Sequence, residues 1–283
     1  MKTAICVCSN SGIDYVDFSE EITVFRSSIQ FGAEETYLDF VELKNKEFYE
    51  RIARNPDDVP KTAYTPIGVM MEAFEEFEKK GYDEVIVICI SSRLSNLFDA
   101  VKNLDNLVNI RVHAFDSKTV AYAQTYMALT AYEMTKQGKN SSEILPILEK
   151  FRANTMTYFT VDTLKYLVKN GRLSKFAGAL GGLLGIRPIL QIEKDGKVAT
   201  LEKAKGSKKA LRRVVELYAN ETMQMENLVT YIVHADYENG VEIMKEEIKK
   251  AFPNREVVAC PLTPVVGAHG GPKSIGIGYI CLD

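Results

Sequence analysis

Val85-Ile86-Val87-Ile88-Cys89-Ile90, followed at once by Ser91-Ser92-Arg93-Leu94-Ser95, is the stretch that decides the fold. A continuous apolar run bounded by charged residues predicts a strand that is buried on both faces, at the centre of a parallel sheet. Open α/β sheets bind their ligands beyond the carboxyl ends of their strands. The serine hydroxyls therefore follow this strand at the place where such a sheet would hold a ligand.

Strand-like and helix-like segments alternate through the first half of the chain. The expected elements are a strand at 3–8, a helix ahead of Pro56, a helix from Ile67, a strand from Val85, a strand at 111–115 and a helix from Thr119. The helix from Ile67 has the clearest pattern, because apolar residues recur along one face with glutamates between them. This alternation predicts a parallel βαβ sheet.

The second half also reads as α/β, with an antiparallel element. After a helix at 141–152, a strand at 156–160 opens a new unit, and we place the domain boundary near Asn154, which gives domains of 1–154 and 155–283. A hairpin of 186–193 and 197–202 is turned by Asp195-Gly196, a dipeptide suited to the positive φ angles of a two-residue turn. The remaining expected elements are helices at 164–168, 207–218 and 237–251 and strands at 228–234, 256–260 and 274–282. The predicted fold is two α/β domains, the first with a parallel sheet and the second with a mixed sheet.

The composition limits the kinds of molecule that the protein is expected to bind. The net charge of −3 over 283 residues excludes nonspecific binding to nucleic acid or to an anionic membrane surface, since both require a basic excess. Five cysteines without a CxxC pair and three histidines indicate neither a zinc site nor a disulfide framework. No apolar run reaches the length of a membrane span. We expect a cytoplasmic protein whose partners are small molecules and proteins.

Four short polar clusters follow strands or lie in loop-like segments. They are Ser9-Asn10-Ser11-Gly12, Thr62-Ala63-Tyr64-Thr65-Pro66, Ser91-Ser92-Arg93-Leu94-Ser95 and Gly267-Ala268-His269-Gly270-Gly271-Pro272. Each alone is typical of ordinary turns and helix caps. Their shared position at strand ends predicts a ligand site.

Ser92, His269 and an acid such as Asp116 suggest a hydrolase triad as an alternative. The Gly-x-Ser-x-Gly elbow that would expose a strained nucleophile is missing around Ser92. The glycine-rich segment at 178–185 does not match the dinucleotide fingerprint, and the chain contains no P-loop motif. A binding protein for a polar small molecule stays open as a further alternative, because a fold does not fix a function.

Taken in order, these clusters resemble the DegV family of bacterial fatty-acid-binding proteins, over essentially the whole chain. The matching segments are Ser9-Asn10-Ser11-Gly12-Ile13-Asp14, Phe31-Gly32, Glu35-Thr36-Tyr37, Thr62-Ala63-Tyr64-Thr65-Pro66, Ser91-Ser92-Arg93-Leu94-Ser95, Asp116-Ser117, Asn170-Gly171-Arg172-Leu173-Ser174, Arg187-Pro188-Ile189-Leu190 and Gly267-Ala268-His269-Gly270-Gly271-Pro272. The chain departs from the family pattern at Ala63, Thr65 and Asn96, which adjoin the expected head-group site.

The resemblance implies a non-catalytic carrier without a cofactor, which holds a long-chain fatty acid in a tunnel between the two domains and presents it to a fatty-acid kinase. It places the fatty-acid carboxyl group near Thr62, Ser92 and His269. Support for the head group would come from Ser91, Ser95, Ser11 and Gly270. Arg172 would face the kinase or close over the carboxyl end. The candidates for the tunnel wall are Phe176, Leu180, Leu183, Leu184 and Ile186.

Overall fold

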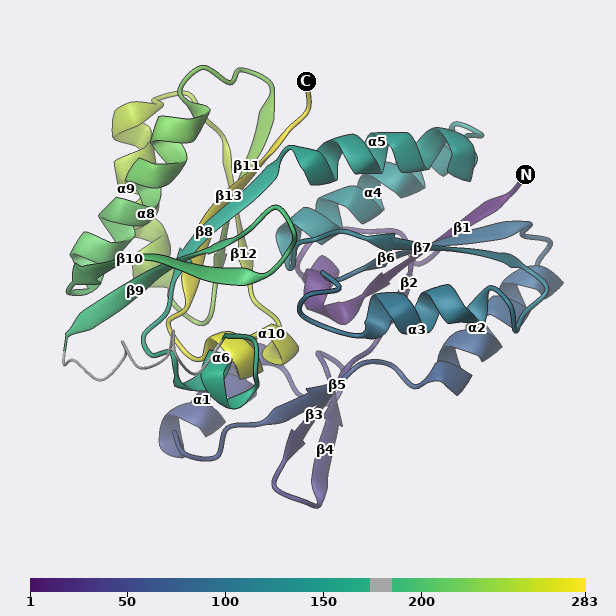
Figure 1. The fold of residues 1–283 in the computed structure, drawn as a ribbon, viewed down its shortest axis with the longest axis horizontal. Helices are drawn as coiled ribbons and strands as arrows, with labels where there is room; N and C mark the ends of the chain where they lie inside the picture. The colour runs from purple at the N-terminus through teal and green to yellow at the C-terminus, as the bar shows by residue number, and fades with distance from the viewer. Residues whose placement is uncertain (174–184) are drawn as a thin grey trace.

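The computed structural model describes residues 1–173 and 185–283, and it contains two large β-sheets with helices packed on their faces (Figure 1). The first sheet has the strand order β2-β1-β6-β7. Its strands are β1 (Thr3–Cys8), β2 (Thr23–Phe25), β6 (Glu84–Cys89) and β7 (Arg111–Asp116). All three pairings are parallel, and β1 and β6 are buried at every residue. The prediction of a buried parallel strand that begins near Val85 is confirmed.

Helices cover both faces of this parallel sheet. Alternate residues of β1 point to opposite faces, so Ala4 packs with the helices on one side and Ile5 with those on the other. Figure 1 shows α4 and α5 above the sheet and α2 and α3 below it. Their bounds are α2 (Ile67–Lys79), α3 (Leu97–Leu104), α4 (Tyr122–Lys136) and α5 (Ser141–Ala153). Helix α4 begins after the expected Thr119, because Ala121 has a φ of 62°, outside the helical region.

The second sheet has the order β10-β9-β8-β13-β11-β12. Its strands are β8 (Thr155–Thr160), β9 (Ile186–Ile192), β10 (Val198–Lys205), β11 (Leu228–His234), β12 (Val257–Pro261) and β13 (Ile275–Cys281). The β11–β12 pair is parallel and the other four pairs are antiparallel, which confirms the predicted mixed sheet. Helices α8 (Ser207–Thr222) and α9 (Glu238–Ala251) cover one face (Figure 1).

Several short elements of the structure are not among those expected from the sequence. A small sheet of order β4-β3-β5 contains β3 (Ser28–Phe31), β4 (Glu35–Leu38) and β5 (Lys61–Ala63). Two 3₁₀ turns, η1 (Ser9–Ser11) and η2 (Ile13–Tyr15), follow β1. Helices α1 (Asn45–Arg54) and α6 (Lys165–Lys169) agree with the helices expected ahead of Pro56 and at 164–168, whereas α10 (Pro264–Gly270) is not among the expected elements. All three helices lie between the small sheet and the mixed sheet (Figure 1). In the part of the chain that the structure describes, no helix is both long and apolar enough to cross a membrane.

Two of the loop assignments are wrong. Thr62 lies within strand β5, where it pairs with Ile29 of β3. His269 lies in the last turn of α10, whose glycine-rich sequence is typical of a turn. Pro264 starts this helix with a preset φ, and Gly267 allows it to pack against α1, where a Cβ atom would come within 2.4 Å of the Tyr49 hydroxyl oxygen.

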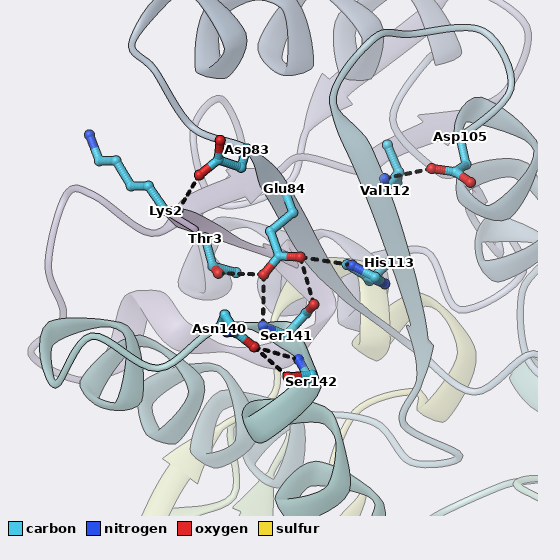
Figure 2. A network of polar contacts seen from close by, with 10 residues as sticks. All are labelled: Lys2, Thr3, Asp83, Glu84, Asp105, Val112, His113, Asn140, Ser141 and Ser142. Atoms are coloured by element: carbon cyan, nitrogen blue, oxygen red, sulfur yellow. Dashed lines mark hydrogen bonds and ion pairs between the residues drawn. The ribbon is translucent and has the colours of Figure 1, made fainter.

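A buried carboxylate joins the amino ends of the parallel strands to α5 (Figure 2). Glu84 of β6 accepts hydrogen bonds from the Thr3 hydroxyl at 2.7 Å and from both the main-chain N–H and the hydroxyl of Ser141, at 2.7 and 2.6 Å. His113 Nε2 lies 3.2 Å from the second carboxylate oxygen. Burial alone would raise the pKa of Glu84, but these hydrogen bonds outweigh it and lower the pKa to about 2.

The Glu84 network predicts a defined loss of stability in acid. Because the pKa in the folded state lies below the ordinary value, the stabilisation is fully present above about pH 4.5 and is lost as the pH falls towards about 2. Glu84→Gln should reduce the free energy of unfolding by about 3 kcal/mol at pH 7. Urea denaturation between pH 7 and 3 should show this difference from the wild type shrinking at low pH.

The matched control is Glu76→Gln, which removes an exposed ion pair with Lys80 on α2. This variant should change stability by less than about 1 kcal/mol at either pH. A Glu84→Gln difference that stays constant with pH would contradict the role assigned to the buried carboxylate.

Candidate functional site

A cavity of about 750 Å³ lies between the parallel sheet, the small sheet and the mixed sheet. This volume falls in the range of about 300–1,000 Å³ that is typical of small-molecule sites. One part of its wall is polar and comes from strand ends and α10, and the wall contributed by the mixed sheet is largely apolar. The apolar lining from the mixed sheet includes Phe159, Ile192, Val198, Val233 and Ile275. The cavity therefore suits a ligand with an apolar body and a polar group.

Helix α10 carries His269 to this cavity and is held at both ends by hydrogen bonds. At its start, the Asp39 carboxylate accepts a hydrogen bond from the Val265 N–H at 3.0 Å. Near its end, the Asn170 side-chain amide donates to the Ala268 carbonyl at 2.8 Å. These contacts come from distant parts of the chain, so the position of His269 depends on the complete fold.

The Thr62 hydroxyl oxygen lies 2.8 Å from His269 Nε2. Burial lowers the pKa of His269 to about 3, with a further contribution from the positive charge of Arg172. The imidazole is therefore neutral at pH 7 and carries one N–H. Its Nδ1 atom is buried and has no hydrogen-bond partner among the described residues. The pair can offer a single proton to a ligand.

Ser92 is bound to Asp116 on the neighbouring strand. Its hydroxyl donates to Asp116 Oδ2 at 2.6 Å, and its main-chain N–H donates to Oδ1 at 3.0 Å. A Ser-His-acid triad requires the histidine between the serine and the acid. Here Ser92 contacts the acid directly and His269 contacts Thr62, so the hydrolase arrangement is not assembled in this structure.

The four residues expected to support a head group separate into two pairs. Ser95 and Gly270 line the cavity. Ser91 and Ser11 do not belong to its lining in the described parts of the chain, and both hydroxyls are used internally. The Ser91 hydroxyl donates to the Gly196 carbonyl at 2.7 Å, and that of Ser11 accepts from the Ile13 N–H at 3.2 Å.

Arg172 follows α6 and lines the cavity, where it is half-buried. Its Nε donates to the Leu94 carbonyl at 2.8 Å and its Nη1 to the Asn170 carbonyl at 2.6 Å. Burial lowers the pKa of the guanidinium. Both contacts are to uncharged carbonyl groups, so they leave a positive charge at the cavity that an anionic ligand could compensate.

The departures from the family pattern lie in and beside this site. Ala63 and Asn96 line the cavity, whereas the Thr65 hydroxyl donates to the Arg26 carbonyl at 2.8 Å. Further polar residues of the lining, which the sequence does not single out, are Ser27, Thr157 and Ser274. Single polar residues beside apolar strands carry no signal of their own, because only the fold brings them together.

The proposed tunnel wall is only partly described. Phe176, Leu180, Leu183 and Leu184 lie outside the described residues. Ile186 is the first residue of β9 and is half-buried, but it does not belong to the cavity lining found in ranges 1–173 and 185–283.

The tip of the β9–β10 hairpin docks on the loop that carries Ser92. Besides the Ser91–Gly196 hydrogen bond, Arg93 Nε lies 3.3 Å from Asp195 Oδ2. Gly196 has a φ of 91°, and a Cβ atom there would lie 2.1 Å from the Ser91 hydroxyl oxygen and 3.0 Å from the Lys118 Cα atom. The hairpin thus connects the mixed sheet to the ligand end of the parallel sheet.

Comparison with known proteins places the whole chain in one family. The family model described as "Uncharacterised protein, DegV family" matches residues 2–281. Protein DegV of Bacillus subtilis is 36% identical over 247 residues, which cover 86% of each chain. A DegV domain-containing protein of Halalkalibacterium halodurans is 32% identical over 259 residues, which cover 91% of this chain and 90% of the relative.

Solved structures agree in fold. The structure of DegV from Bacillus subtilis, which its description calls a fatty acid binding protein, has a TM-score of 0.85, 31% identity and 99% coverage of both chains. A Thermotoga maritima protein described as revealing fatty acid binding function has a TM-score of 0.83 and 28% identity, with both chains fully covered. A DegV family protein from Streptococcus agalactiae has a TM-score of 0.90 at 22% identity over 99% of both chains, which shows the fold alone.

Because the hairpin tip packs closely against Ser91, we predict that position 196 requires glycine. Gly196→Ala should lower the melting temperature by several degrees, because the new methyl group would push the hairpin tip away from Ser91. Gly206→Ala is the matched control, because Gly206 has a similar φ of 85° but nothing lies within 4 Å of the added methyl group. Equal losses measured by calorimetry for the two variants would show that backbone strain alone is responsible and that the docking contact contributes nothing.

Proposed function

This chain belongs to the DegV family, and from this premise we propose that it binds a long-chain fatty acid in the cavity between the two large sheets. The observation that carries the proposal is the division of the cavity wall into an apolar part and a polar part. The Bacillus subtilis and Thermotoga maritima neighbours, at 31% and 28% identity, are both described as binding fatty acid, which supports the same ligand class here.

The energetics of tail burial fit this ligand. Transfer of one methylene group out of water contributes about 0.8 kcal/mol, so roughly fourteen methylene groups contribute about 11 kcal/mol. Association and ordering of the chain cost several kcal/mol of this gain. The remainder is enough for binding in the micromolar range or tighter.

We place the carboxyl group of the fatty acid at Thr62, Ser92 and His269. Support comes from their shared position on the cavity wall and from the close contact between Thr62 and His269. A carboxyl group that enters a partly dry site must keep hydrogen bonds. Ser95 and Gly270 lie where they could assist, whereas Ser91 and Ser11 would act through the hairpin and the η1 turn.

We further propose that the protein presents this carboxyl group to a partner fatty-acid kinase for acyl-phosphate formation, and that it has no catalytic activity or cofactor of its own. A carrier of this kind would work in the cytoplasm. Support for a carrier comes from Ser92, whose hydroxyl is bound to a carboxylate rather than to a histidine base. The charge of Arg172 could compensate both a carboxylate and an acyl phosphate.

The proposed division of the chain into 1–154 and 155–283 fits this function. Every strand of the parallel sheet and of the small sheet precedes Asn154, and every strand of the mixed sheet follows it. A ligand held between the sheets would contact both units.

Removal of single hydrogen-bonding groups tests the carboxyl site. His269→Ala and Thr62→Val should each weaken fatty-acid binding about tenfold, the equivalent of one hydrogen bond. Displacement of a fluorescent fatty acid gives the Kd, and circular dichroism checks that the fold is retained. Thr65→Val is the control, because the Thr65 hydroxyl binds the Arg26 carbonyl and is not part of the cavity lining. Wild-type affinity in both site variants would refute the assignment.

Phosphorylation tests the role of Arg172. The Arg172→Ala protein, loaded with fatty acid and incubated with a bacterial fatty-acid kinase and ATP, should form acyl phosphate at least tenfold more slowly than the wild type. Its bound fatty acid should be retained, because tail burial is unchanged. Arg212→Ala, on the surface of α8, is the control and should leave the rate unaltered. An unchanged rate in Arg172→Ala would remove Arg172 from the proposed transfer.

A further inference from the structure

The hydroxyl of Ser92 has one proton, and Asp116 accepts it. The 2.6 Å contact runs from Ser92 Oγ to Asp116 Oδ2. The other carboxylate oxygen, Oδ1, accepts from the main-chain N–H groups of Ser92 and Lys118, each at 3.0 Å. All three partners are donors, as an ionised carboxylate requires. What Ser92 offers to the cavity is therefore a pair of acceptor sites.

The Thr62–His269 pair supplies only one donor. If Nε2 carries the imidazole proton, it donates to Thr62, and the Thr62 hydroxyl proton is free for the ligand. If Nδ1 carries it, Thr62 donates to Nε2, and the N–H that remains is the one on Nδ1. The three side chains together therefore offer at most one proton to a carboxyl group.

An ionised carboxylate would bring its own acceptor oxygens against the Ser92 oxygen, which can also only accept while its proton is donated to Asp116. A carboxylate has no proton of its own. It could bind Ser92 only if the hydroxyl turned away from Asp116, which would leave two carboxylates competing for one proton. Two carboxylates that share a site raise the pKa of one of them, because they cannot both ionise at low cost.

We propose that the loaded site holds one extra proton, shared between the ligand carboxyl group and Asp116 through the Ser92 hydroxyl. This inference rests on the proposed function, since it requires a carboxylic acid in the cavity. At a pH where the free fatty acid is ionised, the proton is taken up from solvent on binding. Asp116 is then a positioning residue, because it fixes the direction of the Ser92 hydroxyl and so decides the protonation state in which the acid is bound.

Charges from the surrounding elements also bear on this preference. Arg172 favours an anion and so opposes proton uptake, and its bonds to the Leu94 and Asn170 carbonyls use two of the five N–H groups of the guanidinium. Arg93 is ion-paired with Asp195 of the hairpin, and His269 is neutral.

Asp116 itself faces one further cation. Arg152 of α5 directs its Nη1 to the Asp116 main-chain carbonyl at 3.2 Å, and its guanidinium lies over the Phe115 ring. The same guanidinium is ion-paired with Glu149, with Nη2 3.7 Å from Oε1, so its charge is already partly compensated.

The test is titration calorimetry of the full-length protein, stripped of lipid, with palmitate at pH 8 in buffers of different ionisation enthalpy. The slope of the observed enthalpy against the buffer enthalpy counts the protons exchanged. The wild type should take up about one proton, and its affinity should fall by up to tenfold for each pH unit between pH 7 and 9. Binding without proton uptake would overturn this inference and leave the proposed function intact, whereas a failure to bind palmitate, checked by displacement of a fluorescent fatty acid, would overturn both.

Asp116→Asn provides the sharper comparison. The amide oxygen can still accept from the Ser92 and Lys118 N–H groups, and its NH₂ can donate to Ser92 Oγ, which frees the Ser92 proton for the ligand. Proton uptake should fall from about one to near zero, and the affinity should become independent of pH.

Asp105→Asn is the matched control. The Asp105 carboxylate accepts the Val112 N–H at 2.7 Å (Figure 2). Val112 lies near the opposite end of β7 from Asp116, and Asp105 is not part of the cavity lining found among the described residues. Its proton uptake should equal that of the wild type. Equal proton uptake by Asp116→Asn and the wild type would overturn the role of Asp116. If Asp116→Asn does not fold, the proton uptake of the wild type alone still tests whether the loaded site holds an extra proton.

Discussion

The hydrogen bond between Thr62 and His269 joins residues that are 207 positions apart, and the polar part of the cavity depends on it. Thr62 belongs to a three-residue edge strand of the small sheet, and His269 to a seven-residue helix. Neither element would hold its position alone, because isolated helices and strands of this length are marginal in water. Asp39 and Asn170 donate or accept hydrogen bonds at the two ends of α10, and the Tyr49 hydroxyl donates to the Leu262 carbonyl just before the helix.

The electrostatics of the cavity follow from burial. Removal from water keeps His269 neutral, so it offers one N–H and not a charge. Arg172 and Arg93 both lie at the cavity wall, Arg93 in an ion pair with Asp195, and Asp116 lies behind Ser92. A ligand carboxyl group would therefore meet the charge of Arg172, one donor from the Thr62–His269 pair and the acceptor oxygen of Ser92.

The elements that the sequence reveals are those with long, regular patterns. The apolar run at Val85 and the spaced apolar residues from Ile67 identify β6 and α2, and the polar clusters carry the family resemblance. Short strands such as β5 contain too few residues to show an alternating pattern of apolar and polar side chains. The glycines of α10 are typical of a turn, so its sequence does not indicate a helix. The triad hypothesis brought Ser92, His269 and Asp116 together, but sequence cannot tell which two of them touch. Only the parallel register of β6 and β7, which pairs Cys89 with Asp116, brings the acid directly to Ser92.

The central claim is that the cavity holds a long-chain fatty acid, and mass spectrometry of the lipid that copurifies with the protein tests it most directly. The protein would be denatured and extracted with organic solvent. We expect near-stoichiometric long-chain fatty acid in the extract, and its chain length would define the preference of the cavity. A protein that is free of lipid and also fails to take up added fatty acid would contradict fatty-acid binding and favour a polar ligand.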